Sequence, residues 1–157
     1  MSQPFEATEV VPPVVAEGWR LSVTDSRVWG IAFELSTPRD VIGRGALTRC
    51  VAGRLRDAYP VGAHDLELTL ELAESLSEGL AAVARGALAA DPKCRRVVVA
   101  VPVDDAAARA DADSAGLRDA VAIDLRDDGG TQTFQLMVLE PDWVTRVDMH
   151  LDKVPGT

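Results

Sequence analysis

The sequence has no asparagine, a single tyrosine, and only two histidines and two cysteines among 157 residues. Without asparagine there is no N-glycosylation site. Cys50 and Cys94 form no Cys-x-x-Cys pair, and together with the histidines they lack the spacing of metal ligands, so no metal site is expected. A Gly-x-Ser-x-Gly motif is also missing, which leaves hydrolase chemistry unsupported.

Long apolar runs and a signal peptide are missing too. No apolar run approaches the ~20 residues of a membrane span, so no membrane association is expected. The sequence therefore predicts a cytoplasmic, soluble protein in which both cysteines stay reduced.

The net charge of −9 is unevenly distributed along the chain. Residues 1–60 contain seven basic and seven acidic side chains, so the acidic excess lies in the remaining 97 residues. Such a chain repels phosphate backbones, which argues against nucleic acid as the main partner. The acidic part fits a cationic ligand, such as a polyamine or an aminoglycoside, and fits a solvated surface equally well.

The length suits one domain with a single core. Residues 1–17 contain three prolines and little periodicity, and we expect a flexible N-terminal arm there. Residues 18–157 are expected to form the domain itself.

Hydrophobic periodicity and turn residues predict the order of elements. They are a hairpin with strands over 19–23 and 28–35, helices over 46–58 and 75–90, a buried valine-rich strand over 97–103, a helix over 106–115 capped by Asp105, and a hairpin over 120–126 and 133–140. Residues 65–72 alternate as a strand does but also fit helical spacing, and their structure is left open. This order indicates an α/β or α+β fold with a mixed central sheet flanked by helices.

Gly43-Arg44-Gly45 stands between the first expected hairpin and the first expected helix. A strand that passes through a glycine loop into a helix aims free backbone N–H groups at one point, which attracts an anion such as phosphate. Glycine allows phosphate oxygens to approach the backbone closely. A simple flexible turn would explain the same residues.

From Asp91 to Glu140 the sequence resembles the C-terminal half of a GNAT-family acyltransferase. That family has a strand, then Asn-x-x-Ala opening a short helix, then Gly-Phe and a final hairpin. Here Asp105-Ala106-Ala107-Ala108 follows the valine-rich strand, and Gly116-Leu117 comes eleven residues after Asp105. The spacing is the family's, but Asp105, Leu117 and Ala112 stand where the family has Asn, Phe and, in many members, Tyr.

The family's donor loop, Gln/Arg-x-x-Gly-x-Gly/Ala, resembles Asp40-Val41-Ile42-Gly43-Arg44-Gly45, apart from Asp40 at the first position. The resemblance implies that this loop holds the pyrophosphate of acetyl-CoA or another acyl-CoA and that the preceding strand faces the thioester. The residues so implied are Phe33, Leu35, Ile42, Gly43, Arg44, Gly45 and Ala46.

A second segment competes for the role of donor loop. In the family the helix after the loop leads directly into the next strand, whereas residues 59–92 intervene here. Residues 74–79 would fit that position better, but they offer one glycine, and Glu74 and Glu78 would repel a pyrophosphate.

The resemblance implies an N-acyltransferase that moves an acyl group from a phosphopantetheine thioester to a small-molecule amine. The thioester belongs either to an acyl-CoA or to an acyl carrier protein. Glu34 is the carboxylate nearest the glycine loop and is a candidate base, with Glu71 and Glu67 as alternatives if 65–72 is a strand.

A different class of function stays open. The family's usual leaving-group acid has no counterpart, since Ala112 cannot donate a proton. The chain is therefore also compatible with a GNAT-like binding domain that has no catalytic activity, and a homodimer is left open.

Overall fold

The computed structural model of the protein describes residues 10–72 and 76–142. Its elements in chain order are β1 (Arg20–Arg27), β2 (Gly30–Ser36), β3 (Val41–Arg49), a 3-10 turn (Cys50–Ala52), β4 (Leu66–Leu72), α1 (Leu76–Ala90), β5 (Val97–Pro102), α2 (Ala106–Ser114), β6 (Arg118–Asp127) and β7 (Gly130–Leu139).

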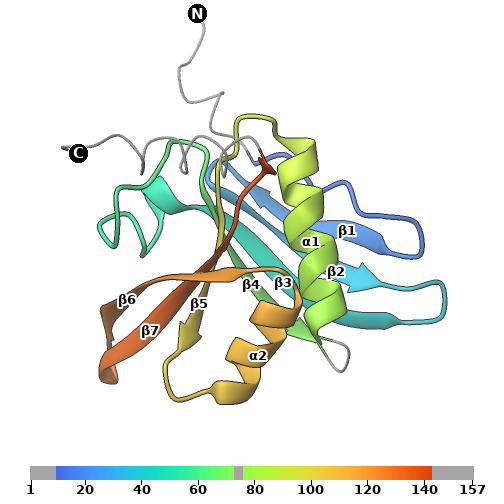
Figure 1. The fold of residues 1–157 in the computed structure, drawn as a ribbon. Helices are drawn as coiled ribbons and strands as arrows, with labels where there is room; N and C mark the ends of the chain where they lie inside the picture. Colours follow the sequence, from blue (N-terminus) through green and yellow to red (C-terminus); the bar gives the residue numbers. More distant parts are fainter. Residues whose placement is uncertain (1–9, 73–75, 143–157) are drawn as a thin grey trace, which may run out of the picture.

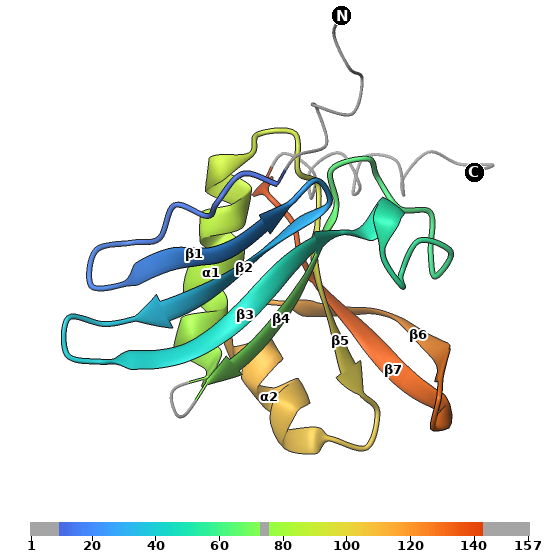
Figure 2. The ribbon, with the colours of Figure 1, turned by 180° about the vertical axis from the view of Figure 1, so that it is seen from behind.

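The strands form one seven-stranded sheet in the order β1-β2-β3-β4-β5-β7-β6. Neighbouring strands are antiparallel except for β4 and β5, which are parallel and are connected through α1. Both helices lie in front of the sheet in Figure 1 and behind it in Figure 2, so they cover the same face. The fold is a mixed α+β sheet, as the order of elements predicted.

Most of the core lies between this sheet and α1. Residues of β2 alternate between the core and the other face, so that Ile31, Phe33 and Leu35 are buried while Glu34 is half-buried. A smaller apolar cluster occupies the opposite face of β5 and β7, beneath the segment 50–61. Strand β5 is therefore covered on both faces, which explains its nearly continuous valine sequence.

Most predicted elements are confirmed, and one is wrong. The C-terminal hairpin, the valine-rich strand and both later helices form as expected, and residues 66–72 form a strand. The first hairpin also forms, but its first strand continues to Arg27, so that the turn falls at Val28-Trp29, inside the second expected strand. The helix expected over 46–58 does not form, because Leu47 and Arg49 continue β3 and pair with β4.

The expected N-terminal arm lies partly outside the described residues, since residues 1–9 are not described. Of the rest, Val10 is buried, and the Val14 N–H donates to the Gly86 carbonyl of α1 at 3.0 Å. In the described part of the chain, neither helix is long and apolar enough to cross a membrane.

Candidate functional site

The parallel strands β4 and β5 pair over only two positions and then separate. The ladder joins Leu66 to Val97 and Glu67 to Val98, although β4 continues to Leu72 and β5 to Pro102. Figure 2 shows the two strands diverging toward their C-terminal ends. We call this opening the splay; it lies between residues 68–72 and 99–102. Its closed end is at Leu66, and its open end is at Leu72.

The direction of the backbone decides which groups face the splay. The Leu66 N–H donates to the Arg96 carbonyl at 3.0 Å, so these two residues direct their backbone groups toward each other's strand. Backbone groups alternate along a strand, and therefore Leu70 and Ala100 also direct theirs into the splay. Beyond the last ladder pair these groups can pair with an extended amide chain or bind a developing oxyanion.

A cluster of buried charges holds the closed end. Asp65, directly before β4, is fully buried, and its Oδ2 accepts hydrogen bonds from the Tyr59 hydroxyl and the Gly62 N–H at 2.9 Å each. The Arg96 guanidinium, directly before β5, lies 3.5 Å from the same oxygen and 3.2 Å from Glu140 at the end of β7. These contacts fix the starts of β4 and β5 relative to the end of β7.

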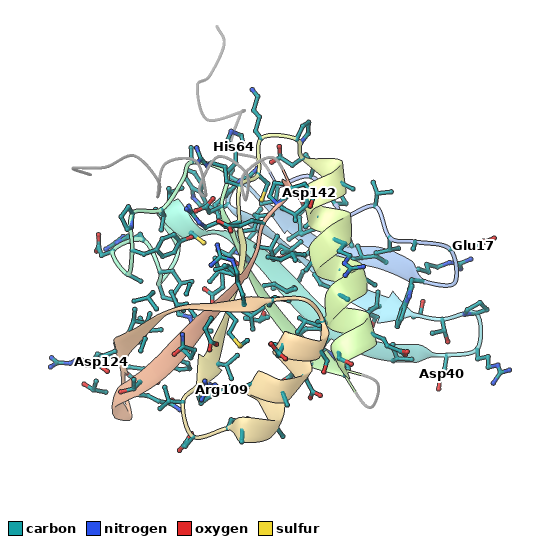
Figure 3. All side chains as sticks on the ribbon, viewed as in Figure 1. Glu17, Asp40, His64, Arg109, Asp124 and Asp142 are labelled. Carbon is teal, nitrogen blue, oxygen red and sulfur yellow. The ribbon has the colours of Figure 1, made fainter. Side chains whose placement is uncertain are left out.

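A second buried group lies beside this cluster. Arg49, at the end of β3, donates to the His64 carbonyl at 2.8 Å, and its guanidinium lies 3.4 Å from Asp91 just after α1. The His64 Nδ1 is 3.3 Å from the same Asp91 oxygen. Figure 3 shows His64 at the end of the molecule opposite to Arg109 on α2. The closed end is thus held by charges and the open end is not part of this network.

Both cysteines are buried at 1% exposure, and burial raises the pKa of Cys50 and of Cys94 to about 12. Burial also raises the pKa of Tyr59 far above its ordinary value. We expect both thiols to resist 5,5′-dithiobis(2-nitrobenzoate) at pH 8 in the native protein and to react on unfolding. Rapid reaction of the native protein would contradict this burial.

The same shifts give a pH dependence with a definite sign. In the unfolded chain the thiols lose their protons near pH 9.0, whereas in the folded protein they hold them to about 12. The folded state therefore binds more protons above pH 9, and the free energy of unfolding should fall as pH rises from 9 toward 12. Urea denaturation at pH 8, 9 and 10 measures this.

A pocket of about 550 Å³ lies next to the splay, on the face opposite to the helices. Glu34, Arg44 and Glu71 line it and form a row across three strands. The register places Glu34 opposite Arg44 on β3, and Arg44 opposite Glu71 on β4. Opposite residues have Cβ atoms about 4.5–5.5 Å apart. Two candidate bases, Glu34 and Glu71, therefore share one pocket, and Glu71 also belongs to the edge of the splay.

Glu67, the third candidate base, is already engaged. Its Oε2 accepts hydrogen bonds from the Arg54 Nε at 3.0 Å and Nη2 at 2.7 Å, and its side chain is 8% exposed. The Arg54 guanidinium also lies over the Phe134 ring of β7, 5.2 Å from its centroid. Arg54 thus connects β4 with β7, and Glu67 is held by Arg54 outside the residues that line the pocket of Glu34 and Glu71. Sequence reasoning missed Arg54, because it lay in the helix expected over 46–58.

The glycine loop predicted at Gly43-Arg44-Gly45 is wrong. These residues lie inside β3 and pair with β2 and β4, so their N–H groups do not converge on one point. Both glycines are needed for packing. A Cβ on Gly45 would come within 2.9 Å of the Phe33 and Leu70 side chains and would also collide with the Thr69 carbonyl.

The other predicted donor-binding residues are divided between the two faces of the sheet. Phe33 and Leu35 are buried in the core, and Ile42 packs against that core. Ala46 lies on the pocket face, between the core residues of β3. That these residues bind the donor stays a prediction, although the glycine loop on which the prediction was based does not form. The connection from β4 to α1 takes the position of the competing segment 74–79, of which residues 74 and 75 lie outside the described part.

Helix α2 is capped by Asp105 as expected, but Ala112, at the position where many GNAT members have a tyrosine, cannot protonate the leaving group. The Asp105 carboxylate accepts the Ala108 N–H at 3.0 Å, and Gly116 follows the helix with a φ of +100°. Ala112 is 1% exposed in the core. Among residues 10–72 and 76–142, no group of three or more His, Cys, Asp or Glu side chains is arranged to hold a metal ion.

No protein-family model matches the sequence, and no curated protein matches it significantly. Solved structures do match the fold. An uncharacterized protein from Bacillus halodurans is 13% identical with a TM-score of 0.64, over 79% of this chain and 66% of that one. RimJ of Mycobacterium smegmatis, solved with CoA-disulfide, is 16% identical with a TM-score of 0.56, over 74% and 56%.

The aminoglycoside acetyltransferase AAC(6')-Ib, solved with coenzyme A, is 11% identical with a TM-score of 0.61, over 76% of this chain and 70% of that one. The chain spans less than two thirds of the length of the first two structures. At these identities the likeness concerns the fold, which is the GNAT fold.

Proposed function

We propose that this protein is a GNAT-like N-acyltransferase that moves an acyl group from a phosphopantetheine thioester to a small-molecule amine. The splay between β4 and β5 carries the proposal, because it leaves backbone groups unpaired between two adjacent strands. The pantetheine arm is an extended chain with two amide groups, and it can pair there as an additional strand does. The structures with bound CoA and CoA-disulfide have the same fold.

The Leu70 N–H provides the electrostatic part of the chemistry. When an amine attacks a thioester, the carbonyl oxygen gains negative charge in the tetrahedral intermediate. An N–H group already fixed at that point stabilises the charge without reorganisation, which is typically worth about 3 kcal/mol. The buried charges at the closed end hold the strand that positions this group.

The pocket of Glu34 and Glu71 provides the amine site. An alkylamine has a pKa near ~10.4 and arrives protonated, so one proton must leave before attack. Glu71 is exposed, belongs to the splay strand, and faces the pocket, which makes it the proposed base. Glu34 binds the ammonium group before deprotonation. An aminoglycoside or a polyamine would suit these two carboxylates.

The sulfur leaves without help from an acid. Tyr59 is engaged by Asp65, and Ala112 cannot donate a proton. A thiol with a pKa near ~8.5 leaves as its thiolate. The nitrogen of the tetrahedral intermediate loses its second proton to this thiolate or to water as the amide forms.

One observation favours the second candidate, a GNAT-like binding domain without catalysis. The first turn of α1, which follows β4, contains Glu78, an acidic residue at the helix end that a pyrophosphate would occupy. Glu78 would repel the pyrophosphate of CoA, which argues against transfer from an acyl-CoA.

Two measurements on the same sample separate the candidates. In the ¹⁵N-labelled protein, S-acetylpantetheine should shift the amide resonances of Leu70 and Ala100, while the edge strand β6 serves as the control. Release of free thiol in the presence of spermidine or kanamycin then reports transfer. Shifts with thiol release support the acyltransferase, and shifts without release for any amine support the binding domain. If the splay resonances do not move, neither candidate stands.

A further inference from the structure

Both helices that begin at the open end of the splay carry a carboxylate at their N-termini. Because β4 and β5 are parallel, their C-terminal ends lie at one edge of the sheet, and α1 and α2 each follow one of them. Glu78 is exposed in the first turn of α1. Asp105 caps α2, and the exposed Asp104 precedes it.

These carboxylates weaken the attraction that helix N-termini usually have for a phosphate. Helix N-termini attract anions through free N–H groups and the positive end of the helix dipole. At α2 one of these N–H groups, that of Ala108, is already bonded to Asp105. At α1 the negative charge of Glu78 lies in the first turn.

Two basic side chains near this edge of the described structure, Arg109 and Arg39, each lie beside an acid. Arg109 of α2 lies 3.7 Å from Asp119 and is paired with it. Arg39 lies in the turn between β2 and β3, beside Asp40, and Figure 3 shows Asp40 at the tip of that hairpin. The pyrophosphate and the 3′-phosphate of CoA would thus meet the carboxylates of Glu78 and Asp104 at this edge.

We infer that the carboxylates at this edge repel the nucleotide of CoA, so that CoA is bound less tightly than pantetheine itself. The inference rests on the proposed function, because it assumes that the splay holds the pantetheine arm. It adds one consequence to that function: the nucleotide part of CoA lowers the affinity of the protein for the donor instead of raising it.

Calorimetric titrations with pantetheine, dephospho-CoA and CoA at 50 and 300 mM NaCl test this directly. Each added phosphate should weaken binding, with CoA about tenfold weaker than pantetheine at low salt, and salt should strengthen CoA binding by screening the repulsion. If CoA binds tenfold more tightly than pantetheine and weakens with salt, the inference is overturned while the proposed function stands. If no ligand binds, both are overturned.

A single substitution locates the effect. Glu78→Gln should tighten CoA binding about threefold or more and leave pantetheine binding unchanged, because it removes one charge at the end of α1. Asp57→Asn is the matched control, since Asp57 is 93% exposed in the segment after β3 and lies beside residues of β6 and β7, not at the start of α1 or α2. An equal response of CoA binding to both substitutions would overturn the role of Glu78.

Discussion

Replacing Gly45 by alanine should destabilise the protein by about 3 kcal/mol, and replacing it by valine should prevent stable folding. A Cβ at this position meets the Thr69 carbonyl and comes within 2.9 Å of the Phe33 and Leu70 side chains. The first of these contacts is with the backbone of a central strand, which cannot move away without breaking the ladder between β3 and β4. For a domain of this size, about 3 kcal/mol lowers the melting temperature by about 10 °C.

Gly53→Ala is the matched control for this experiment. A Cβ there would lie 3.4 Å from a methyl group of Thr48, which is an ordinary contact, and the backbone of Gly53 is extended. Thermal denaturation followed by circular dichroism should therefore show a change of less than about 1 kcal/mol for this variant. Full stability of Gly45→Ala, with loss of donor binding alone, would restore the phosphate-loop interpretation of Gly43-Arg44-Gly45.

Glu71→Gln should reduce the rate of acyl transfer by about 10²- to 10⁴-fold, the range that general-base catalysis contributes. The substitution keeps the size of the side chain and removes both its negative charge and its ability to accept a proton. Because Glu71 is exposed at the end of β4, the fold should be unaffected. Donor binding should also be retained, because it depends on the backbone of the splay.

The pH profile distinguishes a base from a residue that merely binds the amine. If Glu71 accepts the proton, the loss in Glu71→Gln should shrink as pH rises toward the pKa of the amine, since the neutral amine then needs no base. Glu34→Gln should instead raise KM for the amine with a smaller change in kcat. Equal losses at all pH values for Glu71→Gln would assign it a binding role.

The elements with one strong local signal could be predicted from the sequence. The valine run of β5 is buried on both faces, and Asp127-Asp128-Gly129-Gly130 forms the turn of the last hairpin, with Gly130 at a φ of +114°. The helix expected over 46–58 failed because Leu47, Cys50 and Leu55 are buried for different reasons. Leu47 faces the main core from a strand. Cys50 and Leu55 belong to the segment 50–61 and pack against the other face of β5 and β7.

The site was predictable only where a side chain itself carries the chemistry. Glu34 and Glu71 were identified from their charge, and the register of β2, β3 and β4 places them in one pocket. The splay has no sequence signal, because it consists of backbone groups and depends on where a ladder stops. The two glycines of β3 were misinterpreted because glycine is required in both cases. A phosphate-binding loop needs it to let phosphate approach the backbone, and β3 needs it at Gly45 to leave space for the side chains of Phe33 and Leu70.

The short ladder between β4 and β5 also bears on how the chain folds. Strands β1 to β4 follow one another in sequence and pair with their neighbours, and β6 pairs with β7 through a tight turn. The two pairs that join these halves link residues about 30 positions apart, and α1 must form between them. Contacts of such sequence separation form late, because their loop-closure entropy is lost before they contribute stability. We therefore expect the splay, the proposed donor site, to take shape in the final step of folding, when two preformed halves dock.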